Sequence, residues 1–123
     1  MAPGDFAHIV LHSPNGVFPL RAATEMGFER DQIETGLVVT RIGNLYSGSS
    51  LTGLVAVLDV AEPGERILMV SYGSGAGSDA YVFTATEKIL EKRGRLVTLE
   101  EQIESPLSEY IDYNTYRKMK EAC

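Results

Sequence analysis

Cysteine and tryptophan are almost missing from the sequence: its 123 residues include no tryptophan and one cysteine, Cys123, which is the last residue. A single cysteine cannot form a disulfide within the chain, which favours a reducing compartment, and we expect a cytoplasmic location. Two histidines and one cysteine, scattered along the chain, do not make the ligand cluster of a metal site. We expect Cys123 to be a free terminal thiol, because no histidine stands near it in the sequence.

Long apolar runs and an excess of positive charge are also missing. No stretch of about 18 apolar residues occurs, so we expect no transmembrane helix, and residues 1–5 lack the basic and apolar regions of a signal peptide. The net charge is −6, which argues against nucleic acid as a main partner because phosphate recognition needs a basic face. A few local arginines or lysines would still suffice to bind a small anionic ligand.

What the sequence does contain is ordinary for a soluble globular domain, or part of one, with 44% hydrophobic and 23% charged residues. Leu51, Leu54, Val55 and Leu58 are spaced as on one side of a helix. Pro19 is compatible with a helix only in its first turn. The patterns predict strands at 6–11, 37–40, 66–72 and 80–85, and helices at 16–26 and 50–61.

The predicted order is therefore β-α-β-α-β-β, an α/β fold. Helical crossovers imply parallel strands, and the glycine-rich segment 73–79 implies a closing antiparallel hairpin, so the sheet should be mixed. The helix at 50–61 is apolar nearly all round and should be central and buried. We expect this body to span residues 1–86. Residues 87–123 form a charged and aromatic tail, in which Thr98 and Glu101 fit a helix capping box and 111–116 reads as a turn.

Polar or small residues stand where three of the predicted elements end or begin. They are His12, Asn44 in a glycine- and serine-rich segment, and the GSGAG run that contains Ser74. Ligands of open α/β sheets gather outside the carboxyl ends of the strands. Each feature alone has an ordinary structural interpretation, because single histidines, turn asparagines and glycine-rich hairpins are common. The GSGAG run also lacks the Lys-Ser/Thr ending of a phosphate-binding loop.

Taken together, these features resemble the C-terminal half of thiolase-like condensing enzymes, and most closely the archaeal type of 3-hydroxy-3-methylglutaryl-CoA (HMG-CoA) synthase. The resemblance covers nearly the whole chain and is carried by four stretches. They are HSPNGVFPLR (12–21), IGNLYSGSS (42–50), VLDVAEPGERILMVSYGSGAGSDA (57–80) and YIDYNTY (110–116). The resemblance implies an acyltransferase of the mevalonate pathway that condenses acetyl-CoA with acetoacetyl-CoA. Coenzyme A thioesters are then substrates, and no cofactor is permanently bound.

The resemblance also implies roles for four residues. His12 is the acid/base group at acetoacetyl-CoA, and Asn44 hydrogen-bonds the reacting acyl group. Ser74 lies at the acyl-binding site, and Arg21 contacts coenzyme A. These chemical types suit the roles, because a histidine titrates near working pH and a guanidinium suits a phosphate group. We expect His12, Asn44 and Ser74 to converge on one pocket.

Two departures from the family limit what the chain can do alone. Val17 stands where the family has a lysine within reach of coenzyme A. The nucleophilic cysteine and the catalytic glutamate belong to the N-terminal half, so the expected partner is that half, as a separate or missing chain. An acetoacetyl-CoA thiolase, a small zinc-ribbon/OB-fold protein and an oligomer are further implied partners. A ketoacyl-synthase-like acyltransferase subunit and a non-catalytic half-domain used for assembly remain alternatives.

Overall fold

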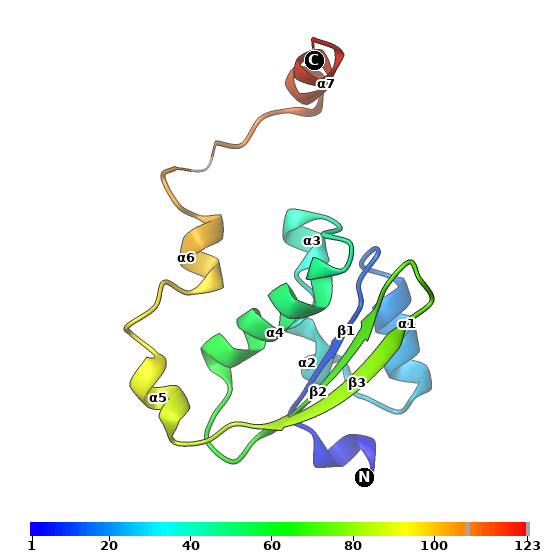
Figure 1. The fold of residues 1–123 in the computed structure, drawn as a ribbon, viewed down its shortest axis with the longest axis vertical. Helices are drawn as coiled ribbons and strands as arrows, with labels where there is room; N and C mark the ends of the chain where they lie inside the picture. The colour runs from blue at the N-terminus through cyan, green and yellow to red at the C-terminus, as the bar shows by residue number, and fades with distance from the viewer. Residues whose placement is uncertain (108, 123) are drawn as a thin grey trace.

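The computed structural model describes residues 1–107 and 109–122 and has an α/β fold built on one small sheet (Figure 1). The chain begins with a single 3-10 turn, η1, at Pro3–Asp5. The strands are β1 (His8–Leu11), β2 (Arg66–Tyr72) and β3 (Ser78–Thr84). The helices are α1 (Phe18–Glu25), α2 (Arg30–Glu34), α3 (Val39–Ile42), α4 (Gly48–Val60), α5 (Lys88–Lys92), α6 (Leu99–Ile103) and α7 (Tyr113–Glu121).

The sheet is mixed, as predicted, with the order β1-β2-β3. β1 and β2 are parallel, with His8 opposite Ile67, and the four helices between them make the crossover. β2 and β3 are antiparallel and form the predicted hairpin, with Tyr72 opposite Ser78. Because β1 and β2 run in the same direction, their carboxyl ends lie at one edge of the sheet, next to the hairpin loop.

Helices cover both faces of β1 and part of β2, whereas β3 is exposed along its whole length. On one face, α1 and α2 enclose a cluster centred on Ile9, Leu11 and Ile33, to which Leu68 and Val70 of β2 contribute. On the other face, α4 packs through Val57 against Val10 and against alternate residues of β2. Successive side chains of a strand point to opposite faces, so β1, which is nearly all apolar, is buried from both sides.

The predicted strand at 37–40 is wrong: the segment turns into the one-turn helix α3. Val38 and Val39 are buried there, so the β-branched pair reflects burial and not strand pairing. The preceding Gly36 passes close to β1, where a Cβ would lie 3.2 Å from the carbonyl oxygen of Ile9. The sheet consequently has three strands among the described residues, not four. The aromatic stretch 111–116 is also not a turn, because α7 begins at Tyr113 with Asp112 as its N-cap.

Helix α4 has two apolar faces, and only one is covered within the described chain. The covered face is made of small residues and a valine, namely Ser49, Ser50, Gly53 and Val57. The face predicted from the leucine spacing points away from the sheet, with Leu51 61% and Leu58 38% exposed. Val55 is exposed on the same face. We call Leu51, Leu54, Val55 and Leu58 the α4 stripe. Leu54 packs partly against the core, whereas Leu51, Val55 and Leu58 are exposed among the described residues.

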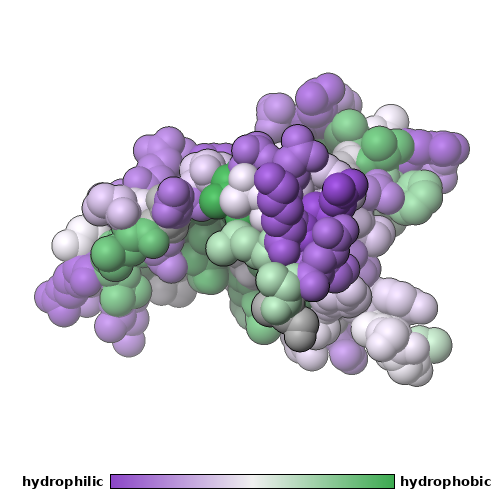
Figure 2. Space-filling model, turned by 90° about the horizontal axis from the view of Figure 1, so that it is seen from above, coloured by the Kyte–Doolittle hydropathy of each residue, from purple (hydrophilic) through white to green (hydrophobic). Residues whose placement is uncertain are grey.

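The tail from α5 to α7 runs away from the sheet, and α7 lies far from the body (Figure 1). Hydrogen bonds fasten its first part: Arg93 donates to Glu62 at 2.9 Å and to the carbonyl oxygen of Ala61. The predicted capping box is confirmed, because Thr98 Oγ1 accepts from the N–H of Glu101 and Glu101 accepts from the N–H of Thr98. From the C-terminal end, Figure 2 shows hydrophobic side chains at the surface beside strongly hydrophilic ones.

Candidate functional site

A small pocket lies where the carboxyl ends of β1 and β2 meet the N-terminal end of α4. Its volume is about 170 Å³. His12 follows β1 directly, Ser74 follows β2 in the hairpin loop, and Asn44 lies between α3 and α4. The structure therefore brings these three residues, far apart in the sequence, to one pocket. The lining is completed by Tyr46, Ser47, Tyr72 and Gly73.

His12 is held by its backbone and by an aromatic neighbour. Its N–H donates to the carbonyl oxygen of Val70 at 3.0 Å, which extends the pairing of β1 with β2 by one residue. Its ring lies 5.8 Å from the ring of Tyr72, centroid to centroid, at an angle of 53°. The Nδ1 atom is buried and has no hydrogen-bond partner among the residues that the structure describes. The backbone of His12 is thus fixed at the end of β1, its ring lies beside Tyr72, and its Nδ1 atom is without a partner among the described residues.

Asn44 is oriented by the turn in which it lies. Gly43 ends α3 in a left-handed conformation, with φ of 78°, which glycine adopts without strain. Asn44 Oδ1 accepts a hydrogen bond from the N–H of Tyr46 at 2.7 Å, and Tyr46 itself has a positive φ of 54°. Because a backbone N–H must face an acceptor, the Nδ2 amide of Asn44 turns to the other side. The side chain therefore offers an uncharged donor held in one orientation.

The hairpin loop that carries Ser74 is closed by its own backbone. The N–H of Gly73 donates to the carbonyl oxygen of Gly77 at 3.0 Å, and Ala76 adopts a positive φ of 59°. A Cβ placed on Gly73, Gly75 or Gly77 would meet no atom within 4 Å. No contact within the described chain therefore demands these glycines. Their small size leaves open space beside the pocket for a ligand or for another part of a protein.

Ser47 belongs to the glycine- and serine-rich segment that was predicted to lie at the site, whereas Tyr46 and Tyr72, which also line the pocket, were not predicted. Tyr72 is the last residue of β2, so its place at the carboxyl end of a strand was a usable signal. Ser47 and Tyr72 also line a neighbouring cavity of about 450 Å³ between β2, β3 and Leu51 of the α4 stripe. The pocket thus adjoins the face of the molecule that has no cover.

Arg21 is not part of this pocket. It lies on α1, where its guanidinium is 3.8 Å from Glu25 and its side chain is 70% exposed. The residues around it, Leu20, Thr24 and Glu25, line a separate surface depression. Val17, which precedes α1, is exposed as well. Cys123 lies outside the described residues.

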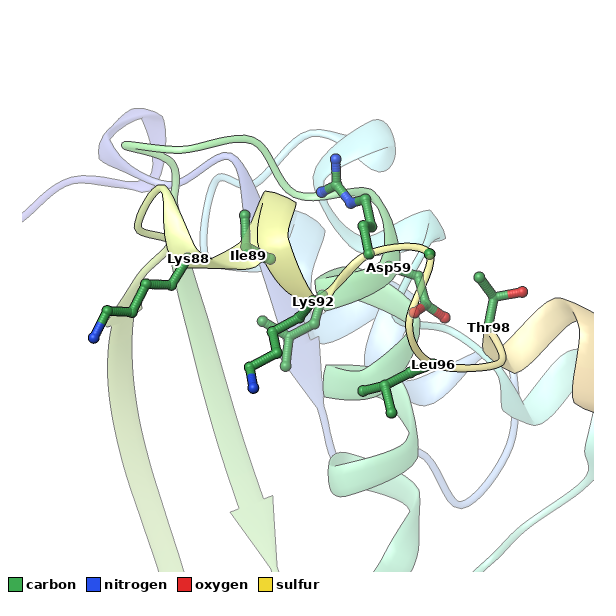
Figure 3. A pocket seen from close by; sticks show the side chains of 9 residues that line it. Asp59, Lys88, Ile89, Lys92, Leu96 and Thr98 are labelled. Atoms are coloured by element: carbon green, nitrogen blue, oxygen red, sulfur yellow. The ribbon is translucent and has the colours of Figure 1, made fainter.

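A larger and mostly apolar pocket of about 330 Å³ lies between the C-terminal end of α4, α5 and the segment that leads to α6 (Figure 3). Lys88 and Lys92 extend from α5 beside it, Leu96 lies opposite them, and Asp59 comes from α4. Asp59 is engaged, because it accepts a hydrogen bond from the N–H of Leu99 at 2.7 Å. None of the predicted site residues lines this pocket, and Leu58 of the α4 stripe does. We therefore attribute it to the uncovered apolar face.

Residues 1–107 and 109–122 contain neither a cluster of metal-binding side chains nor a membrane-spanning helix. No group of three or more His, Cys, Asp or Glu side chains is placed so that it could hold a metal ion. No helix of that part of the chain has the length and apolar character needed to cross a membrane.

Curated relatives share about half of their residues with this chain over part of their length. The hydroxymethylglutaryl-CoA synthase of Methanopyrus kandleri is 54% identical over 120 residues, which is 98% of this chain and 34% of that protein. The hydroxymethylglutaryl-CoA synthase of Pyrobaculum aerophilum is 48% identical over 119 residues, 96% of this chain and 33% of that protein. The chain spans about one third of the length of these relatives. No protein-family model matches it.

Solved structures match the fold of the chain, again over about one third of their length. MvaS in complex with 3-hydroxy-3-methylglutaryl coenzyme A gives a TM-score of 0.78 at 24% identity, covering 98% of this chain and 35% of that one. An HMG-CoA synthase complexed with CoA gives a TM-score of 0.72 at 20% identity, covering 96% and 33%. The three-stranded sheet, its helices and most of the tail therefore recur together inside larger proteins.

Proposed function

The chain is homologous to about one third of the archaeal hydroxymethylglutaryl-CoA synthases, and we propose that it supplies the His12–Asn44 side of such an enzyme's active site. The reaction is the condensation of acetyl-CoA with acetoacetyl-CoA. The observation that carries the proposal is the pocket itself, because His12, Asn44 and Ser74 gather there from three separate segments. The pocket also adjoins an uncovered face, where another part of the enzyme would complete it.

His12 acts as the acid/base group in this proposal. A base of the missing half first removes a proton from the methyl carbon of the acetyl group, which leaves an enolate. When that methyl carbon attacks the ketone carbon of acetoacetyl-CoA, a carbon–carbon bond forms and the electron pair of the C=O bond moves onto oxygen. That oxygen needs a proton, and a histidine is suited to donate one because its ordinary pKa lies near neutral pH. The ring of His12 lies in the pocket beside the tilted ring of Tyr72, where it can face the bound ketone.

Asn44 and Ser74 bind the reacting groups. The Oδ1 atom of Asn44 is occupied by the N–H of Tyr46, so its amide N–H remains to donate to an acyl oxygen. Donors fixed before the reaction stabilise developing negative charge without reorganising, which is a large term in acyl-transfer catalysis. The open glycine loop around Ser74 lets backbone N–H groups approach the same oxygen. Arg21, outside the pocket, is proposed to contact a phosphate of coenzyme A.

The remaining two thirds of the enzyme provide what this chain lacks. In the family that the chain resembles, the acyl-accepting cysteine and the glutamate that forms the enolate lie in the N-terminal half. We propose that this half covers the α4 stripe, so that α4 is buried on both faces in the assembled enzyme. The stripe is suited to this, because exposed apolar patches of this kind mark protein contacts.

The first prediction is that the chain alone does not catalyse condensation. Purified chain given acetyl-CoA and acetoacetyl-CoA should release no coenzyme A above background, measured with a thiol reagent. Adding the part of the Methanopyrus kandleri synthase that this chain does not match, as a separate polypeptide, should restore release. The cause is that the nucleophile and the base are then present beside His12.

Two outcomes would contradict the proposal. Release by the chain alone would mean that the nucleophile has been misplaced. No release from a folded, associated pair would favour a non-catalytic role for the chain in assembly.

The second prediction concerns the α4 stripe. Replacing Leu51 with glutamate should weaken association with the remaining two thirds by about tenfold or more, because a buried leucine contributes roughly 1.5–3 kcal/mol and a buried unpaired carboxylate adds a further cost. The chain's own melting temperature should stay the same, since Leu51 is 61% exposed. Titration calorimetry measures the affinity. Leu107→Glu is the matched control, because Leu107 is 95% exposed and lies outside the stripe; equal weakening by both variants would show that the stripe is not the contact.

A further inference from the structure

The one-turn helix α3 contacts three parts of the molecule, namely the core, the loop after His12 and the tail. Its last residue, Ile42, is separated from Asn44 of the pocket only by Gly43. A single helical turn is not stable by itself, because helix formation has a costly nucleus and few hydrogen bonds to offset it. The orientation of Asn44 therefore depends on what holds α3 from outside.

The inner side of α3 is held by the core and by the loop after His12. Val38 and Val39 are buried. Thr40 packs against Gly16 so closely that a Cβ on Gly16 would lie 2.8 Å from Thr40 Cγ2. Two of the segments that form the pocket are thus in contact through Thr40.

The outer side of α3 is held by the tail. Arg41 binds both carboxylate oxygens of Glu100 on α6, with Nη2 2.9 Å from Oε1. This two-point geometry suits the planar guanidinium and resists rotation. The hydrogen bond from Arg41 lowers the pKa of Glu100 below its ordinary value, so the carboxylate is charged at neutral pH. Glu100 is itself fixed, because α6 is capped by Thr98 and tied to α4 through Asp59.

We propose that Arg41 and Glu100 are positioning residues for Asn44: their ion pair uses the tail to hold α3, and α3 sets the turn that presents the Asn44 amide to the pocket. The structural part of this inference stands on the contacts above. Its catalytic part rests on the proposed function. The tail then supports the site by holding α3 in place, although none of its residues lines the pocket.

The first test measures the hydrogen exchange of backbone amides by NMR on the chain of 123 residues. Glu100→Gln removes the charge pair. The amides of Gly43 and Tyr46, which donate to Val39 and to Asn44 Oδ1, should then exchange roughly two- to fivefold faster, as expected for loss of an exposed ion pair. Exchanging the charges, with Arg41→Glu and Glu100→Arg together, should restore the slow rate. Glu34→Gln is the control, because it removes the Arg30–Glu34 pair, at 3.7 Å, away from the pocket.

Unchanged exchange of both amides in Glu100→Gln would overturn the proposal whatever the activity of the enzyme. The catalytic part is tested by measuring kcat and KM of the enzyme assembled from this chain and the remaining two thirds. There, Glu100→Gln should lower kcat two- to fivefold with little change in KM, and the charge exchange should restore it. Faster exchange with unchanged kcat would overturn the catalytic part. If the wild-type assembly is inactive, the proposed function has failed, and the exchange experiment still decides whether the tail holds the Asn44 turn.

Discussion

Replacing His12 with alanine in the assembled synthase should lower the rate of coenzyme A release by roughly a hundredfold or more. Loss of a general acid/base group usually has an effect of this size. His12 is the one histidine in the pocket, and among its described lining residues no other side chain has an ordinary pKa near neutral pH. The rate should be measured at saturating substrate, per folded complex, so that a change in assembly is not mistaken for a change in chemistry.

The chain provides a matched control in its other histidine. His8 lies at the opposite end of β1, where its Nε2 is 3.5 Å from a carboxylate oxygen of Glu65, and it does not line the pocket. His8→Ala should leave turnover per folded complex nearly unchanged. An unchanged rate in His12→Ala would instead support a chain that only binds or assembles, and equal losses in both variants would indicate damage to β1.

Replacing Gly53 with alanine should lower the free energy of unfolding by about 1–3 kcal/mol, the usual cost of overpacking a core. In an exposed helix the same change would stabilise by roughly 1 kcal/mol. The sign reverses here because a Cβ at this position would lie 2.6 Å from the carbonyl oxygen of Gly36 and 2.8 Å from Val10 Cγ1. A backbone oxygen cannot move aside as a flexible side chain can, so α4 would have to shift away from Gly36 and from Val10 of β1. Urea unfolding followed by circular dichroism measures the change.

Gly48→Ala is the control for this substitution. Gly48 lies in the first turn of the same helix, and a Cβ there would meet only Leu45 Cβ at an ordinary 3.7 Å. This variant should be neutral or slightly more stable. A Gly53→Ala chain as stable as the wild type would show that α4 and β1 are not packed as closely as described.

Much of the fold follows from local sequence signals. Both predicted helices, three of the four predicted strands and the hairpin occur within a few residues of the predicted ends. The successes have a common cause, since each segment is apolar in a regular pattern and is bounded by glycine or proline. The failure at 37–40 has a different cause. Val38 and Val39 favour a strand locally, but the segment forms a single helical turn in which both are buried. Tertiary packing therefore overrides the local preference for a strand.

The orientation of α4 shows what a hydrophobic pattern omits. The leucine spacing identified an apolar face of which Leu51, Val55 and Leu58 are exposed, and only Leu54 reaches the core. The close contacts of α4 are made by small residues instead. A Cβ on Gly53 would lie 2.6 Å from the backbone carbonyl oxygen of Gly36, and Ser50 donates to the carbonyl oxygen of Val70 in β2. A scale that ranks residues by hydrophobicity gives such positions little weight.

It was possible to predict from the sequence which residues meet in the pocket, but not which contacts each of them makes there. His12 and Ser74 follow strands whose carboxyl ends meet at one edge, so parallel pairing brings them together. Asn44 joins them because α3 and α4 place its turn at the same edge. The predicted residues did not include Tyr72. Arg21, which is predicted to contact coenzyme A, lies on the exposed surface of α1, and that contact stays a prediction. The chemical roles of all four residues remain proposals.

The pairing of β1 with β2 also sets the order in which this chain can fold. His8 must find Ile67, with four helices between them, and such distant partners meet slowly because a long loop must close first. β2 and β3 are joined by a short loop, so their hairpin forms on the microsecond scale typical of local pairs. During synthesis, β1 leaves the ribosome before β2 and β3 and stays without its partner until the hairpin has emerged. Because β1 is the most buried strand, the pocket at its end cannot take shape until that late step.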